Sequence, residues 1–239
     1  MNENLRCLNC DNIIEENFCP KCGQKASTKR ITIQGLITSV INSLSNIDKG
    51  FLFNLKHLTL TPRKTIQDYI DGKRKDVFKP VQYAIIAVTL LTLADQYFAT
   101  SVLINTEQRH TMEGTLLFQK SYNYGRFIHE NLKYLWFLNV FFFSIPTYFF
   151  FKRYNFAEHL AINAFVIGHV SLITALALPI TGIRIVFNPI PFVLVAIMYM
   201  FIFSRKRHLI ETGVISLLSV FVGYVLFFLV PFLVLFPFL

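Results

Sequence analysis

The stretch HLAINAFVIGHVSLITALALPIT, residues 159–181, decides the class of fold. It contains no Asp, Glu, Lys or Arg. A helix rises about 1.5 Å per residue, so about 20 apolar residues cross the hydrocarbon core of a bilayer. The stretch therefore predicts a transmembrane helix.

Further apolar stretches lie on both sides of this one. The chain of 239 residues is 54% hydrophobic and contains 26 Phe, more apolar surface than a soluble domain of this size buries. The third and fourth stretches are separated only by residues 181–184, so one broken or re-entrant unit is the alternative there. We predict an all-α integral membrane protein with about five transmembrane helices, at residues 81–104, 134–151, 159–181, 185–203 and 212–237.

The distribution of Lys and Arg predicts the orientation in the membrane. Residues 1–80 hold 13 of the 23 Lys and Arg residues, and such cations stay on the cytoplasmic side. We therefore predict a multi-pass protein of the cell's inner membrane with a cytoplasmic N-terminus. Five spans would then leave the C-terminus extracytoplasmic.

Residues 1–24 predict a small zinc ribbon that precedes the membrane domain. All four cysteines of the chain lie here in two Cys-x-x-Cys pairs, and Gly23 permits a tight turn beside the second pair. Four thiolates form a closed tetrahedral set, which is typical of structural rather than catalytic Zn²⁺. The expected metal ligands are Cys7, Cys10, Cys19 and Cys22.

Disulfide bonds are the alternative for these cysteines. They require an oxidising compartment, whereas the predicted orientation puts the cysteines in the reducing cytosol. The eight residues between the two pairs are fewer than the commoner spacing of about 15–20, but the smaller loop is sterically reasonable.

Residues 25–79 predict a cytosolic or interfacial region of amphipathic helices, before a transmembrane domain at 80–239. Apolar residues at helical spacing predict one helix over 32–46, and a second is expected to begin after Asp48 as its N-cap. A third is expected over Pro62–Asp71, with Thr61 as its cap and Gly72 in the left-handed C-terminal conformation.

A set of cations lies around the third of these helices and before the first span. One interpretation is positive-inside topology with snorkelling stems, and the other is contact with anionic lipid or a partner protein. Nucleic acid is an unlikely partner, because topology explains the net charge of +9 and no aromatic stacking platform accompanies the cations. The candidate contact residues are Arg63, Lys64, Lys73, Arg74, Lys75 and Lys79.

Three polar residues in the predicted spans form a candidate intramembrane site. Ionisable groups at this depth are costly and often functional. His169 is central in the third span, with Asn163 on the same helix, and Asp95 lies on the first span. The alternative for His169 is a neutral imidazole bonded to a neighbouring helix, and Asp95 can be interfacial.

Three blocks of sequence together carry a resemblance to a known family. They are FCPKCGQK at 18–25, the segment from NIDKG to PVQY at 46–83, and KRYNFAEHLAINAF at 152–165. The chain resembles bacterial multi-pass membrane proteins that have a domain of unknown function and an N-terminal zinc ribbon. The matching positions are Asp48, Lys49, Gly50, Pro62, Tyr69, Gly72, Arg74, Pro80, Glu158 and His159.

A more distant similarity is to five-span Yip-type membrane proteins, which also have a cytosolic N-terminus. The two resemblances imply the topology and the ribbon, and they imply no activity, ligand or catalytic residue.

Two functions fit these features. The first is a non-enzymatic scaffold or adaptor, in which the ribbon and the basic helices hold a protein partner or anionic lipid at the cytosolic face. Its spans would anchor the chain in membrane lipid and allow homo-oligomers. The second is a small transporter or pore that uses the polar residues and Pro-broken spans. No Gly-x-Ser-x-Gly, His-Glu-x-x-His or Walker sequence is present, so we expect no enzyme.

Overall fold

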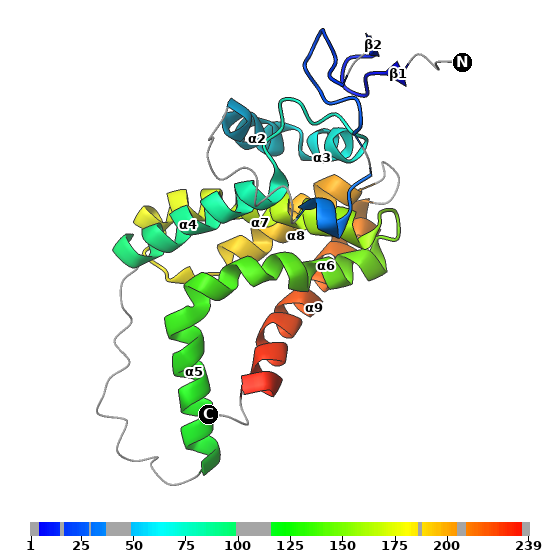
Figure 1. The fold of residues 1–239 in the computed structure, drawn as a ribbon. Coiled ribbons are helices and arrows are strands. Elements are labelled where there is room, and N and C mark those ends of the chain that lie inside the picture. Colours follow the sequence, from blue (N-terminus) through cyan, green and yellow to red (C-terminus); the bar gives the residue numbers. More distant parts are fainter. Residues whose placement is uncertain are drawn as a thin grey trace.

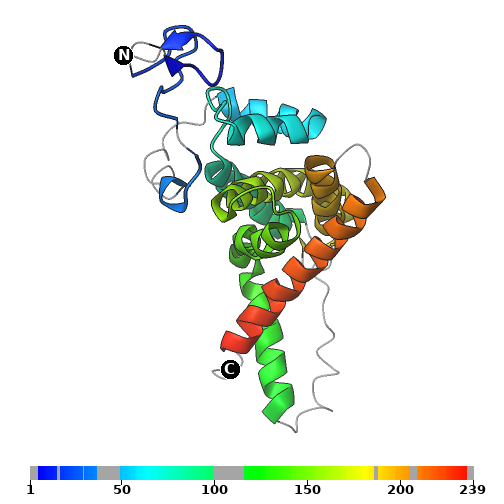
Figure 2. The same ribbon diagram turned by 90° about the vertical axis from the view of Figure 1, so that its right-hand side faces the viewer.

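The structure, a computed structural model, has three parts stacked one above another (Figure 1). A small lobe, formed by the described residues from 5 to 28, lies at one end. Helices α2 and α3 lie beneath it, and longer helices lie beneath those. Two of the longer helices, α5 and α9, extend away from the lobe in both views (Figures 1 and 2). The described residues are 5–14, 17–28, 30–36, 49–98, 116–185, 188–204 and 209–235.

The elements follow the predicted all-α class apart from the lobe, where β1 and β2 pair antiparallel. Residues 33–36 are helical at the start of the helix predicted over 32–46, and the rest of that prediction lies outside the described residues. The elements are β1 (Leu5–Arg6), β2 (Ile13–Ile14), α2 (Lys49–Leu60), α3 (Pro62–Ile70), α4 (Pro80–Phe98), α5 (Leu116–Leu135), the 3₁₀ turn η2 (Trp136–Leu138), α6 (Asn139–Phe150), α7 (Phe156–Thr181), α8 (Ile190–Phe203) and α9 (Leu209–Leu235).

Helix α7 is the centre of the helical assembly, because α4, α6 and α8 all pack against it. Its closest neighbour is α4. A Cβ atom at Gly168 would meet Cδ1 of Tyr83 at 2.8 Å and Cα of Ala84 at 3.0 Å. The missing side chain therefore lets the two helix backbones approach closely, as small residues do in membrane helix pairs.

Three of the described helices are long and apolar enough to cross a membrane. They are Pro80–Phe98, Phe156–Thr181 and Leu209–Val234. These helices are those of a membrane protein, in agreement with the composition. The apolar segments Trp136–Phe150 and Ile190–Phe203 are shorter than about 20 residues. They correspond to the second and fourth predicted spans, so the number five remains a prediction.

Helices α5 and α6 form one path that bends sharply at η2 (Figure 1). Nε1 of the buried Trp136 donates to Oγ of Ser171 on α7 at 3.1 Å. Nδ2 of Asn139 donates to the carbonyl of Trp136 at 3.0 Å. The 3₁₀ turn and these two bonds account for the bend, because they redirect the chain along α7.

Helix α3 has nearly the predicted ends. Pro62 is its first residue, Asp71 is its C-cap, and Gly72 has a φ of +103°. Thr61 is the N-cap residue as predicted, but its hydroxyl makes no cap bond and donates to the carbonyl of His57 in α2. The predicted cap of α2, Asp48, lies outside the described residues.

Replacing Gly168 by Ala should lower the stability of the protein, because the new methyl group would push α4 away from α7. We expect a loss of about 1–3 kcal/mol in the free energy of unfolding, measured by denaturant titration in detergent micelles. Gly125→Ala is the matched control, because no described residue lies within 4 Å of a Cβ at that helical position. Equal stability of the two variants would contradict the close approach.

Candidate metal centre and its docking surface

The two Cys-x-x-Cys loops of the lobe have the same local structure. The amide of Asp11 donates to the carbonyl of Cys7 at 2.9 Å, and the amide of Gly23 donates to that of Cys19 at 2.8 Å. Asp11 and Gly23 both have positive φ, +57° and +70°. Asp11 therefore occupies in the first loop the place that Gly23 has in the second. Asp is one of the few side chains that tolerate this conformation.

The loops bring the four sulfur atoms together. All four Sγ atoms lie within 4.8 Å of one another. Sγ of Cys7 lies 3.5 Å from that of Cys22, and the Sγ atoms of Cys10 and Cys19 are also 3.5 Å apart. All four thiols are free of disulfide bonds. Tetrahedral thiolate ligands around an ion are about 3.8 Å apart, so the cluster can bind a metal ion.

The electrostatics of the cluster also favour a cation. Hydrogen bonds from the backbone, that of Cys22 first, lower the pKa of Cys19 to about 6. At Cys10 a backbone hydrogen bond from Asn12 lowers the pKa, but desolvation and the neighbouring sulfurs outweigh it and raise the pKa to about 12. One thiolate therefore forms readily and opposes the ionisation of the next. A cation between them would remove that opposition.

The lobe is docked on the connection between α3 and α4. Gln24 is 5% exposed. Its Nε2 donates to the carbonyl of Gly72 at 2.7 Å, and its Oε1 accepts from the amide of Arg74 at 3.0 Å. A Cβ at Gly72 would meet Cδ1 of Leu8, from the first Cys-x-x-Cys loop, at 2.6 Å. Both loops therefore contact the connection directly.

A second link runs from the segment after the lobe to the start of α7. Nε and Nη2 of Arg30 donate to the two carboxylate oxygens of Glu158 at 2.7 and 3.1 Å. Glu158 also forms a capping box with Asn155, because each side chain accepts from the other's amide at 2.8 Å. Glu158 raises the pKa of Arg30 through its hydrogen bond and its charge. The segment after the lobe is thereby bonded to the N-terminal end of a candidate span.

Two of the predicted contact cations, Arg63 and Lys73, bond to acceptors within the protein. Arg63 donates through Nη1 to the carbonyl of Ser204, the C-cap of α8. Nζ of Lys73 lies 3.1 Å from Oδ1 of Asp68. Arg63 therefore joins α3 to α8, which is a structural role that the sequence analysis did not foresee.

The remaining predicted cations have separate surroundings. Lys64 and Lys73 line a cavity of about 300 Å³. Arg74 lines a different cavity, which Glu158 of α7 also lines. Lys75 approaches the lobe, because its Nζ would lie 3.3 Å from a Cβ at Gly23. Lys79 is partly buried just before α4. The structure thus distributes the six cations over several places.

Asn163 joins three helices within the candidate membrane region. Its Nδ2 donates to Oγ of Ser144 at 3.1 Å and to Oγ1 of Thr147 at 3.0 Å, both on α6. Its Oδ1 accepts from the hydroxyl of Tyr199 on α8. All of these side chains are buried. A buried amide with such partners holds neighbouring helices together through hydrogen bonds.

His169 and Asp95 also have partners within the described residues. Nδ1 of His169 lies 3.1 Å from the hydroxyl of Tyr83 on α4, and its Nε2 lies 3.2 Å from that of Thr59 on α2. Oδ1 of Asp95 accepts from the amide of Ile185 at 2.9 Å, in the connection from α7 to α8. The structure therefore does not bring the three predicted polar residues together. Their contacts are those of residues that hold helices in place.

Comparisons with known proteins agree with the uncharacterised class. Residues 48–92 match a family described as "Protein of unknown function (DUF3667)". The match covers α2, α3 and most of α4, which is the part of the chain on which the lobe docks. No curated protein and no solved structure gave a significant match, so the distant similarity to Yip-type proteins has no support in these comparisons.

Several residues of the docking surface were absent from the sequence-based prediction. The sequence does not reveal Gln24 and Arg30, because their hydrogen-bond partners lie 48 and 128 residues away in the chain. One signal was available: Gln24 belongs to the block FCPKCGQK, which carries the resemblance to the family. For Arg30 no local pattern indicates that Glu158 is its partner.

Replacing Gln24 by Ala should undock the lobe while leaving the four cysteines in place. The change would leave the carbonyl of Gly72 and the amide of Arg74 without partners, at a cost of about 1–3 kcal/mol. Amide hydrogen exchange should then become faster at residues 71–75.

Asn12→Ala is the control for this variant. The side chain of Asn12 lies in the lobe, and among the described residues it donates to the carbonyl of the adjacent Ile13 alone. Its exchange at residues 71–75 should equal that of the wild type. If Gln24→Ala also left the exchange rates unchanged, the docking contact would contribute nothing.

Proposed function

We propose that the chain is a non-enzymatic membrane scaffold or adaptor that holds a protein partner or an anionic lipid at the cytosolic face of the membrane. The observation that carries the proposal is the bidentate contact of Gln24 with the connection after α3. Together with the Arg30–Glu158 pair, it ties the cysteine lobe to the helices below. A partner bound to the lobe would therefore be held at a set place relative to the membrane.

Zinc is the ion that we propose for the cysteine cluster. Thiolates are soft ligands, and four of them leave no open position for substrate or water. Such an ion supplies folding energy to the lobe and no catalytic chemistry. The low pKa of Cys19 and the spacing of the sulfurs support this assignment.

The proposed topology has five spans, a cytosolic lobe and an inner-membrane location in a bacterium. It is supported by the concentration of Lys and Arg before residue 80 and by the three long apolar helices. Helices α6 and α8 would provide the other two crossings, since short helices can cross where the bilayer thins locally. Membrane lipid or a second copy of the chain would cover the exposed apolar side chains of α9, which include Leu209, Ile210, Val214, Leu217, Phe221 and Leu233.

The contacts of the polar residues favour the scaffold over a transporter. The side chains of Asn163 and His169 are engaged with hydroxyl groups of neighbouring helices. A transport site would have to break these bonds to bind an ion or a solute. The scaffold needs no catalytic residue and no path through the membrane.

The proposal is tested with chain purified in detergent, by metal analysis and by mass spectrometry of the lipids and proteins that purify with it. The wild type should contain about one zinc ion per chain. The double variant Cys19→Ser/Cys22→Ser should contain none, because half of the ligand set is lost, and should lose a protein or lipid that the wild type retains.

Lys21→Ala is the control, since Lys21 lies between these two cysteines and supplies no ligand. It should keep both the zinc and the bound species. Absence of zinc from the wild type would overturn the metal assignment. An identical set of bound species in all three proteins would overturn the adaptor function.

A further inference from the structure

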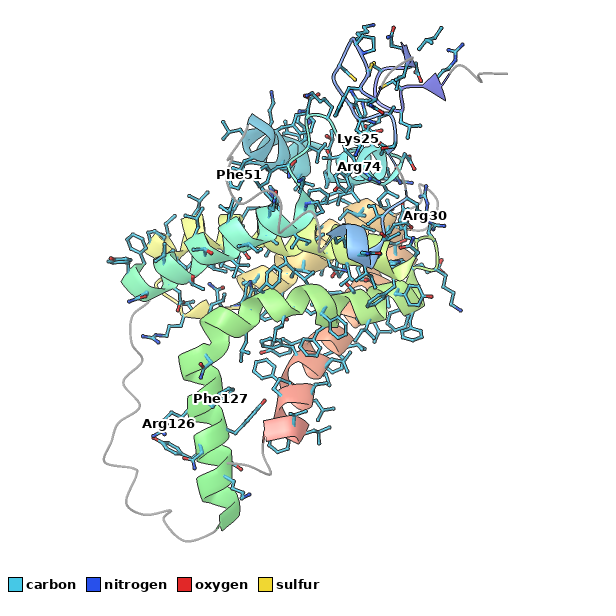
Figure 3. All side chains as sticks on the ribbon, in the orientation of Figure 1. Lys25, Arg30, Phe51, Arg74, Arg126 and Phe127 are labelled. Atoms are coloured by element: carbon cyan, nitrogen blue, oxygen red, sulfur yellow. The ribbon has the colours of Figure 1, made fainter. Side chains whose placement is uncertain are left out.

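A cavity of about 370 Å³ lies where the lobe, the end of α3 and the connection from α6 to α7 meet. Leu8 and Thr28 of the lobe form one wall, and Gly72 lies at the end of α3. Its charged lining includes Arg30, Arg74, Arg153, Asp71 and Glu158. Figure 3 labels Arg30 and Arg74, which lie on the same side of the molecule beneath the lobe.

Two guanidinium groups of this lining, those of Arg74 and Arg153, have no carboxylate partner among the described residues. Glu158 is neutralised by its bidentate pair with Arg30. The salt bridges between described side chains include neither Arg74 nor Arg153. Asp71 is the remaining acid, so the lining carries a net positive charge.

Arg74 is held in a fixed orientation at this cavity. Its Nε donates to the carbonyl of Tyr69 at 3.0 Å, and its guanidinium carbon lies 5.1 Å from the centre of the Tyr69 ring. Its Nη2 is buried and has no hydrogen-bond partner among the described residues. Because Nε is bonded and Nη2 is buried, Nη1 is the nitrogen of Arg74 that remains for a ligand, on a guanidinium group that the Tyr69 ring holds in place.

An apolar groove of about 220 Å³ lies beside the same segment of chain. Residues 30–36 border both spaces, because Arg30 lines the polar cavity while Ile33 and Leu36 line the groove. Arg30 and Ile33 are three residues apart in the chain, so their Cα atoms lie within about 11 Å of each other. A fatty acyl chain is longer than this distance, so one lipid can reach both spaces. The other residues of the groove are Val81, Phe137, Leu138, Val140, Phe141 and Leu160, and all are apolar.

We propose that the two spaces bind one anionic phospholipid. The phosphate accepts hydrogen bonds from Arg74 and Arg153 in the cavity, and one acyl chain lies in the groove. Guanidinium groups form charge-assisted hydrogen bonds with phosphate, and a soluble phosphorylated ligand would leave the apolar groove unfilled. The inference rests on the proposed topology, which puts the N-terminal end of α7 at the level of the cytosolic headgroups.

The test is a titration of the full chain in detergent with dioleoylphosphatidylglycerol, followed by native mass spectrometry. Dioleoylphosphatidylcholine serves as the zwitterionic comparison. Arg74→Ala/Arg153→Ala should raise the Kd for the anionic lipid about tenfold or more, because charge-assisted hydrogen bonds are lost. Lys75→Ala/Lys152→Ala removes the same charge from adjacent residues that do not line the cavity, and it should change the Kd less than about twofold.

Two further variants separate the parts of the site. Arg74→Lys keeps the charge but loses the bond to the Tyr69 carbonyl and the planar group over the Tyr69 ring, and it should also weaken binding. Ile33→Trp would fill the groove, and it should weaken binding of the dioleoyl lipid while leaving the soluble dibutanoyl analogue unaffected. These variants keep the test valid should Arg74→Ala fold poorly.

Three results would overturn the proposal. Equal affinity for the two dioleoyl lipids would show that the arginines do not recognise the anionic headgroup. Equal weakening of binding by both double alanine variants would show the same. Displacement of the lipid by glycerol 3-phosphate at equal concentration would identify a soluble phosphate ligand instead. Failure of the adaptor function would be seen separately, as an unchanged set of bound proteins in Cys19→Ser/Cys22→Ser.

Discussion

The contact between α4 and α7 is the constraint on which the other parts depend. A single glycine, Gly168, lets Tyr83 and the backbone at Ala84 lie directly against α7. The same approach puts the Tyr83 hydroxyl within hydrogen-bonding distance of His169, which in turn reaches Thr59 on α2. Since lipid supplies no hydrophobic force between helices, close packing and such bonds determine their arrangement. The position of α2, and with it the surface under the lobe, follows from this contact.

The cysteine lobe is too small to be stable through its own apolar core. Its buried cluster consists of Cys7, Ile14 and Cys19. Two supports compensate for this: the amide of Gln24 bonded to the connection after α3, and the zinc ion that we propose between the sulfurs. Because the second support belongs to the helical region, the state of the lobe and the shape of the cavity beneath it are coupled.

The basic residues illustrate why charge near a membrane does not indicate one role. Arg63 closes the end of α8, Lys73 pairs with Asp68, and Arg74 lies over Tyr69 at the proposed phosphate site. An arginine satisfies several acceptors in one plane, whereas a lysine is a mobile point charge. The arginines therefore carry the connections between elements, and the exposed Lys64 and Lys75 contribute mainly to the field at the surface.

By itself, the sequence determined the features that depend on neighbours in the chain. The cysteine spacing predicted the cluster, Pro62 and Gly72 predicted the ends of α3, and the apolar stretch at 159–181 predicted α7, because each pattern acts within a few residues. Only the tertiary structure decided which distant groups meet, as with Arg30 and Glu158 across 128 residues. Such pairs depend on how closely the helices pack, and helix packing is a property of whole surfaces that no local pattern contains.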